Sequence, residues 1–245
     1  MFLWGGTMIK FFRRIRQQLL SENKFTKYLI YAAGEIVLVV IGILIALKIN
    51  DWNNYATDRE KEKAILEEVN REFRLNKLEF NRAKSYHQTS DSLLDTLLAS
   101  LPWTDDDLGR LFPSFEEAVG TLTFNPSQGV TNSLINSGNY ELIQNDTLRN
   151  LLLRWNDVYE DFLEEELNHQ KFRYEVMEPL VAEYTDLSMP NNPESMLKNS
   201  TFFKSVRFRN LLFLMKGRLS PVIKDLEDAT VENHIDEIIR LTEQP

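Results

Sequence analysis

The stretch from Tyr28 to Ile49, YLIYAAGEIVLVVIGILIALKI, constrains this chain more than any other feature. It is almost wholly apolar and contains only two charged residues, Glu35 and Lys48. A bilayer core of about 30 Å requires roughly 20 apolar residues in a helix that rises about 1.5 Å per residue. The stretch meets this requirement and therefore predicts a transmembrane helix over residues 28–49.

Charge is distributed unevenly on the two sides of this segment. Residues 1–27 contain a single acid, Glu22, and six basic residues: Lys10, Arg13, Arg14, Arg16, Lys24 and Lys27. The whole chain has a net charge of −9, so the part that follows the span is strongly acidic. Because short flanks rich in Lys and Arg stay in the cytoplasm, we expect the N-terminus inside the cell and everything after Ile49 outside it.

The N-terminal residues have two further features. Residues 8–20, MIKFFRRIRQQLL, combine apolar and basic residues at helical spacing, which is typical of an amphipathic helix lying on membrane lipid. The apolar run exceeds the roughly 7–15 residues of a signal peptide and lacks a small-x-small cleavage site after it, which predicts an uncleaved signal anchor. Residues 1–7, MFLWGGT, are either a peripheral anchor or an extension upstream of a start at Met8.

Six residues of the span are candidate site residues for self-association or for contact with ions or lipid: Glu35, Gly34, Leu38, Val39, Gly42 and Ala46. Their spacings of three and four place them on adjoining stripes of one helix side. Small residues let helices approach closely in lipid, and a carboxyl group costs less between helices than against lipid. We therefore expect a homo-oligomer. Three roles for Glu35 remain open: structural hydrogen bonding, ion or proton transfer, and headgroup contact.

Residues 50–101 predict one long membrane-proximal helix, because Gly and Pro are absent from Ala56 to Leu101. From Leu66 onward, apolar residues recur in steps of three and four. Three polar residues interrupt this seam: Asn76, His87 and Ser90. Such a heptad pattern is typical of a coiled coil or a bundle helix, in which polar members set the register at a cost in stability.

Residues 102–245 predict the other helices of an exported bundle, because strand-like alternation does not persist anywhere in them. The fold class is therefore all-α, with a single transmembrane helix, a long helix and a helical bundle. Capping residues, turn formers and prolines predict these boundaries: a capping box at Ser114 and Glu117, a cap at Asp146, a helix end or kink at Pro179, a polar linker over 185–200, a cap at Ser200 and a break near 217–221.

Two clusters of residues allow alternative interpretations. The acid run Asp105–Asp107 lacks the alternation of an EF-hand loop, which favours a helix-capping turn over a Ca²⁺ site. Six aromatic residues either line a pocket or pack in the core, and core packing is the favoured interpretation: Trp103, Phe112, Phe115, Phe124, Tyr140 and Trp155.

The sequence shows no pattern that supports catalysis. Its three histidines, His87, His169 and His234, lie far apart, and none has a second ligand at i+4. A nucleophile elbow, a phosphate-binding glycine loop, a dinucleotide fingerprint and cysteines are all absent from the sequence. We therefore predict no enzyme, no catalytic residue, no metal and no cofactor. The acidity of the exported part argues against binding of nucleic acid.

Residues 8–53, which include MIKFFRRIRQ, GEIVLVVIGILIAL and NDWN, resemble a family of membrane proteins of Bacteroidota-type bacteria that is classed as a domain of unknown function. The stretch SGNYELIQNDTLRNLL, Ser137–Leu152, is similar to the exported region of that family. The resemblance implies a bacterial inner-membrane protein with a cytoplasmic N-terminus and a periplasmic helical domain. It implies no activity.

Three functions agree with these features. The first is a single-pass protein that self-associates and presents its helical domain as a scaffold or interaction module. The second is an auxiliary subunit of an ion-coupled complex, which uses Glu35 and requires a multi-span membrane partner. The third is a ligand-sensing helical bundle, which is disfavoured because residues 1–27 are too short to form a cytoplasmic enzyme.

Overall fold

The structure is a computed structural model that describes residues 14, 25–189 and 192–243. Every regular element in these residues is a helix, which confirms the predicted all-α class. The chain divides into two compact units, Met1–Glu60 and Lys61–Pro245, which we call the N-terminal unit and the C-terminal unit. Helix α2 (Phe25–Ala99) includes residues of both units.

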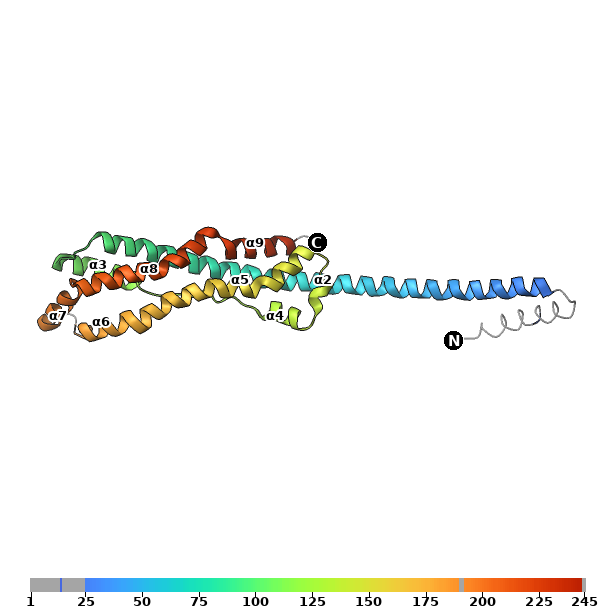
Figure 1. Cartoon of the computed structure of the whole chain (residues 1–245), viewed down its shortest axis with the longest axis horizontal. Coiled ribbons are helices and arrows are strands. Elements are labelled where there is room, and N and C mark those ends of the chain that lie inside the picture. The colour runs from blue at the N-terminus through green and yellow to red at the C-terminus, as the bar shows by residue number, and fades with distance from the viewer. Residues whose placement is uncertain (1–13, 15–24, 190–191, 244–245) are drawn as a thin grey trace. The chain divides into compact units, whose positions relative to one another are not determined.

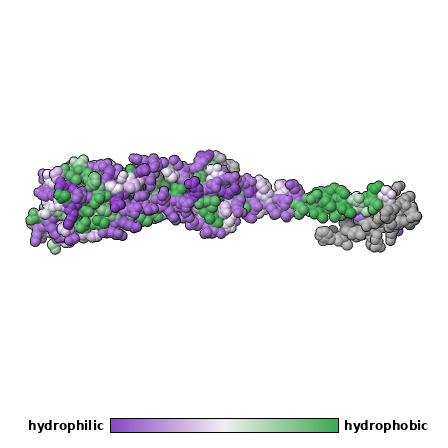
Figure 2. Space-filling view, viewed as in Figure 1, coloured by the Kyte–Doolittle hydropathy of each residue, from purple (hydrophilic) through white to green (hydrophobic). Residues whose placement is uncertain are grey.

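The part of α2 in the N-terminal unit is the stretch of the described chain that has the length and composition of a membrane span. Its most apolar window has a mean hydropathy of 2.6 and no buried residue. All residues from 36 to 49 are exposed, and Figure 2 shows the hydrophobic surface that they form. An apolar helix surface of this kind is suited to lipid rather than to water.

The C-terminal unit contains the second part of α2 and a series of shorter helices (Figure 1). They are α3 (Asp105–Ala118), α4 (Gly129–Asn136), the 3₁₀ turn η1 (Asn139–Leu142), α5 (Asp146–Lys171), the π-helical segment η2 (Phe172–Met177), α6 (Glu178–Tyr184), α7 (Pro193–Phe203), α8 (Val206–Asp228) and α9 (Thr230–Thr242). Helix α5 packs against both α8 and α9. The three helices thus cover one another along a shared core.

The apolar seam of α2 is buried in this core, as its periodicity predicts. Phe73 and Phe80 are 0% and 1% exposed. The Phe73 ring lies 5.0 Å from Trp155 of α5, edge to face, and the Phe80 ring lies 5.4 Å from Phe124. Such edge-to-face pairs are favourable beyond the area they bury. Burial of these rings holds α2 against α5.

A second aromatic group lies where α3, α7 and α8 meet. Trp103 is 5.0 Å from Phe208, Phe203 is 4.9 Å from Phe208, and Phe115 is 5.3 Å from Phe208. All four side chains are buried. The core-packing interpretation of the aromatic residues is therefore confirmed, because the other two of the predicted six, Phe112 and Tyr140, also pack against the core.

Helix starts differ from the predicted ones by up to ten residues. The capping box of α3 is formed by Thr104 and Asp107 rather than by Ser114 and Glu117. Hydrogen bonds from the Thr104 backbone, from Arg110 and from the Thr104 hydroxyl lower the pKa of Asp107 to about 2. The acid run is therefore a capping turn, as favoured, and Ser114 lies inside the helix that it was predicted to open.

Two other caps are displaced by shorter distances. Helix α5 is capped by the Asn145 side chain, which accepts from Leu148 N at 3.0 Å, and not by Asp146. Helix α8 is capped by Ser205, which accepts from Phe208 N at 3.2 Å, and not by Ser200. In each case the capping side chain resembles the predicted one in chemistry and accepts a hydrogen bond from a free N–H group of the first turn.

The predicted linker is too long at its C-terminal end, and the predicted break is wrong. Part of the segment 185–200 forms α7, which begins at Pro193 behind an Asn192 cap. Helix α8 continues through Gly217 and Pro221 to Asp228. Burial of one face of α8 along its whole length offsets the loss of a backbone hydrogen bond at proline. Pro179 is the residue at which the sequence predicts a helix end or kink. It lies in the first turn of α6, directly after the π-helical segment η2.

The turn between α8 and α9 occurs at Ala229, which adopts the left-handed conformation with φ 54°. This conformation is unfavourable by roughly 1 kcal/mol for a residue with a Cβ, and glycine adopts it without that cost. We expect Ala229→Gly to raise the free energy of unfolding by up to about 1 kcal/mol in denaturant titration of the detergent-solubilised chain. A loss of stability would contradict the strained turn.

The contact between Phe73 and Trp155 predicts a large mutational effect. Phe73→Ala removes a fully buried ring and should lower the free energy of unfolding by about 3–5 kcal/mol. Leu75→Ala on the same helix is the matched control, because Leu75 is 55% exposed and should cost less than about 0.5 kcal/mol. Unfolding monitored by tryptophan fluorescence gives both free energies. If the two substitutions lowered the free energy of unfolding equally, this result would contradict the burial of Phe73 and the exposure of Leu75.

Candidate functional site: a sealed polar cluster on α2 and α5

An extended segment, residues 119–128, connects α3 to α4 within the C-terminal unit. Val119 and Phe124 of this segment are 0% and 1% exposed. Buried N–H and C=O groups require hydrogen-bond partners, and no strand in the described residues pairs with this segment. Polar side chains of α2 and α5 provide partners instead.

Two of the polar seam residues of α2 bind this connection or the end of the helix that precedes it. The Ser90 hydroxyl donates to the Ala118 carbonyl at 2.5 Å. The Asn76 amide donates to the Ser127 carbonyl at 2.8 Å and accepts from the Ser127 N–H at 2.7 Å. Each seam interruption therefore satisfies main-chain groups that apolar side chains would leave without partners.

Glu72 of α2 occupies the N-terminal end of α4. Its carboxylate accepts from the N–H of Val130 at 2.8 Å and from the N–H and hydroxyl of Thr131 at 3.0 and 2.7 Å. The N-cap residue of α4, Gln128, makes no capping bond through its side chain. A carboxylate is favourable at the positive end of a helix, so Glu72 replaces the missing local cap although it is 4% exposed.

His87 and Glu166 form the centre of the cluster. His87 Nε2 lies 2.7 Å from Glu166 Oε1, and neither side chain has exposed surface. The second carboxylate oxygen accepts from the Phe124 N–H at 2.8 Å. Glu166 thus joins α5, α2 and the extended segment at one point. Such a buried pair is destabilising to break, because the remaining partner stays buried without its hydrogen bond.

His169 lies one turn after Glu166 on α5, and its ring centre is 6.4 Å from that of His87. It is 1% exposed, and among the described residues its Nε2 and the Nδ1 of His87 have no hydrogen-bond partner. Burial, with a smaller contribution from His87, lowers the pKa of His169 to about 4. The π-helical segment begins three residues later, at Phe172, and such segments are frequent at functional sites.

The three central side chains of this cluster, His87, Glu166 and His169, are sealed from solvent. Among the described residues, no group of three or more His, Cys, Asp or Glu side chains could hold a metal ion. The sequence does not reveal that His87 and His169 lie together, because 82 positions separate them. In this cluster Glu166 holds the extended segment through the Phe124 N–H, and burial lowers the pKa of His169.

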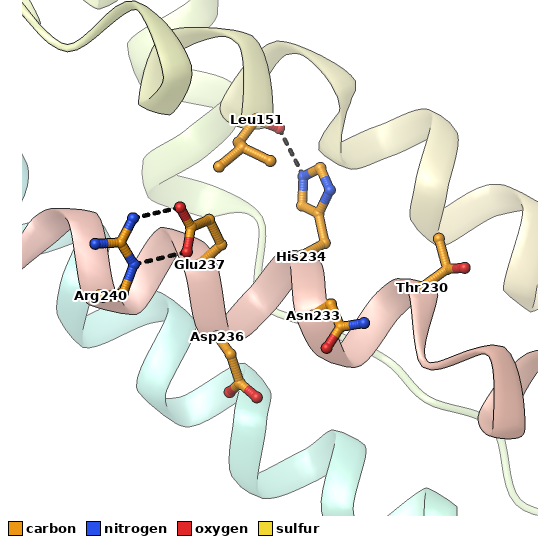
Figure 3. A pocket seen from close by; sticks show the side chains of 7 residues that line it. All are labelled: Leu151, Thr230, Asn233, His234, Asp236, Glu237 and Arg240. Atoms are coloured by element: carbon orange, nitrogen blue, oxygen red, sulfur yellow. Dashed lines mark hydrogen bonds and ion pairs between the residues drawn. The ribbon is translucent and has the colours of Figure 1, made fainter.

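The third histidine, His234 of α9, lies at the edge of a surface hollow (Figure 3). Its Nε2 donates to the Leu151 carbonyl of α5 at 2.8 Å, and its ring lies 5.8 Å from Trp155. Partial burial lowers its pKa. Further along α9, Glu237 and Arg240 form a two-bonded ion pair at 2.7 and 2.5 Å. His234 therefore joins α9 to α5, which is a packing role.

The candidate residues of the span all lie on α2 in the N-terminal unit. Gly34, Leu38, Val39, Gly42 and Ala46 are exposed, and Glu35 is half-buried. A Cβ placed on Gly34 or Gly42 would meet nothing within 4 Å. The structure thus leaves this helix side open, and its role in self-association stays a prediction.

The described residues include little of the predicted basic membrane-surface segment. Arg14 is exposed, and Lys27 belongs to α2. The remaining basic candidates lie outside the described residues: Lys10, Arg13, Arg16 and Lys24. Their predicted contact with lipid is therefore a matter of sequence alone.

The fold and this cluster define an all-helical protein with one candidate membrane span and a sealed polar core. A family model described as a family of unknown function, DUF6090, matches residues 35–216, and the chain belongs to that family. The match begins at Glu35, so it does not include the basic N-terminal part of the motif, and the Bacteroidota-type origin stays a prediction. Neither the curated proteins nor the solved structures provide a match.

The low pKa of His169 predicts that acid destabilises the C-terminal unit. Between the unfolded pKa of 6.5 and the folded pKa of about 4, only the unfolded state binds a proton at this ring. Stability is therefore present above pH 6.5 and is lost as the pH falls, by up to about 3 kcal/mol at roughly 1.4 kcal/mol per pH unit. We expect His169→Leu to remove most of this fall in denaturant titrations at pH 7 and pH 5.

His234→Gln is the matched control, because His234 is less buried and should account for a smaller part of the slope. Carboxylates with a lowered pKa, such as Asp107 and Asp186 at about 2, lose their stabilising effect only below this window. An unchanged slope in His169→Leu would show that another group is responsible for the acid sensitivity.

Proposed function

We propose that this chain is a single-pass membrane protein that self-associates through its span and presents an acidic helical domain as a scaffold or interaction module. The observation that carries the proposal is the fully exposed apolar surface of α2 over residues 36–49. Such a surface is unfavourable in water and needs lipid or partner helices around it.

The location belongs to the same proposal. The basic residues before the span favour a cytoplasmic N-terminus, because positively charged flanks stay inside. The resemblance of residues 8–53 favours a bacterial inner membrane, with the C-terminal unit in the periplasm as a helical bundle. Its long apolar seam on α2 and the packing of α5 against α8 and α9 support the bundle arrangement.

A non-enzymatic role is also part of the proposal. The best-defined polar cluster, His87, Glu166 and His169, is sealed from solvent, and both carboxylate oxygens of Glu166 bind partners within the unit. A substrate needs an accessible pocket with convergent polar groups. The cluster supports a structural role for the domain, and the domain contributes an interaction surface.

Glu35 supports a second candidate function, an auxiliary subunit of an ion-coupled complex. It is the acid of the predicted span, and ionisable residues within membrane helices are commonly functional. It lies in a shallow surface hollow with Ala32, Ile36, Val39 and Val40. This function requires a separate multi-span membrane protein, which should remain in the purified particle.

The open surface at Gly42 predicts how self-association responds to mutation. We expect native mass spectrometry of the detergent-extracted full chain to show a homo-oligomer, and Gly42→Leu to shift it toward the monomer, because the larger side chain prevents close helix approach. Val40→Leu, which lies about 160° from Gly42 around the helix, is the control and should leave the oligomer unchanged.

Two results would contradict this picture. A wild-type chain that is monomeric at all concentrations would exclude self-association through the span. A particle that contains a second, multi-span protein would favour the ion-coupled candidate. In that case Glu35→Gln should keep the assembly intact and abolish its ion flux, whereas the homo-oligomer should tolerate this substitution.

A further inference from the structure

Helix α8 has apolar residues on two opposite faces. On one face Phe208, Leu212 and Met215 are completely buried in the core. On the other face Val206, Phe213 and Leu214 are 60%, 71% and 49% exposed. At about 100° per residue, Val206 and Phe213 lie within roughly 20° of each other. We call these three exposed residues the α8 stripe.

Cations border the α8 stripe on both sides. By the same helical geometry, Arg209 and Lys216 lie on one side of it, and Arg207 and Arg218 on the other. The stretch from residue 195 to 218 contains six Lys and Arg residues and no Asp or Glu. This is unusual in a chain with a net charge of −9.

Three of these cations form no ion pair with any of the described residues. Lys216 pairs with Asp91 and Asp95 at 2.7 and 2.8 Å, whereas no ion pair involves Arg207, Arg209 or Arg218 there. Arg207 lies over the Tyr184 ring at 4.5 Å. The arginines beside the stripe are thus available for an anionic partner.

Helix α7, which directly precedes α8, adds to this surface. Met196 and Leu197 are 57% and 71% exposed, and Lys198 next to them is also exposed. Figure 2 shows hydrophobic surface among hydrophilic residues at the end of the C-terminal unit where α3, α7 and the start of α8 lie. Large exposed apolar patches on a soluble unit commonly mark an interaction surface.

Charge and shape together indicate the partner. A second copy of the same stripe would bring like cations together, which is repulsive. A partner helix usually docks into a groove, whereas these apolar side chains project from the outside of a helix. Protruding apolar residues bordered by cations are typical of surfaces that insert into the interface of an anionic bilayer.

We propose that the α8 stripe, with the exposed end of α7, binds the surface of a bilayer that contains anionic lipid. Phe213, Leu214 and Val206 enter the headgroup region, and Arg207, Arg209 and Arg218 contact lipid phosphates. This inference deepens the proposed function, because it assigns a partner to the helical domain, and it rests on that function only for the membrane anchor.

The test uses the full chain in nanodiscs of phosphatidylcholine, mixed with separate vesicles and analysed by flotation. We expect flotation with vesicles that contain phosphatidylglycerol, none with phosphatidylcholine vesicles, and weaker binding as salt increases. Arg207→Gln/Arg209→Gln should weaken binding about 25-fold, since each cation near an anionic surface contributes about fivefold. Phe213→Asn/Leu214→Asn should weaken it at least about tenfold.

Leu75→Asn/Leu78→Asn is the matched control, because it removes two leucines of α2 that are 55% and 65% exposed, and it should bind like the wild type. The basic residues before the span are present in every variant, so differences between variants report on α8. Thermal unfolding checks that each exposed substitution leaves the fold intact.

Equal flotation of the wild type and both α8 variants, or no flotation of the wild type, would overturn the proposal. Association of two nanodiscs without vesicles that both α8 variants abolish would also overturn it, since the stripe would then bind protein. A chain that fails to enter nanodiscs would contradict the membrane anchor instead, and the same vesicles would then test α8 on the full chain in solution.

Discussion

The C-terminal unit depends on how it satisfies the main chain of residues 119–128. This segment buries Val119 and Phe124 without a β-sheet partner in the described residues, and an unpaired buried N–H or C=O group is costly. Asn76 of α2 and Glu166 of α5 bind main-chain groups of Ser127 and Phe124. Ser90 and Glu72 of α2 bind the helix ends on either side of the segment, at Ala118 of α3 and Val130 of α4. The polar residues within the seam are therefore needed where they are, and apolar substitutes would leave buried groups without partners.

The same requirement explains the buried cluster of His87, Glu166 and His169. Glu166 must be buried to reach the Phe124 N–H, and His87 gives its other oxygen a partner. His169 is then enclosed beside this pair by the packing of α5 at the start of the π-helical segment. The cluster is thus a consequence of holding the extended segment against α2 and α5, and the lowered pKa of His169 follows from its burial.

The two units expose different kinds of surface. Over residues 36–49, α2 exposes apolar side chains on all sides, as lipid demands. In the C-terminal unit the same helix buries one face and exposes charged residues on the other. The stripe on α8 combines the two patterns, since it is apolar, exposed and bordered by arginines. Under the proposal made above, an interface between water and anionic lipid satisfies both its apolar side chains and its arginines.

The sequence alone determined the features that depend on local composition and periodicity: the all-α class, the apolar segment of membrane-span length and the buried seam from Val69 to Leu97. These follow from side chains within a few turns of one another. Only the tertiary structure decided the partners of Glu72 and Glu166, the proximity of His87 and His169, and the continuity of α8 through Pro221. Those outcomes depend on contacts between residues distant in the chain, because burial against other helices offsets local preferences and selects which polar groups meet.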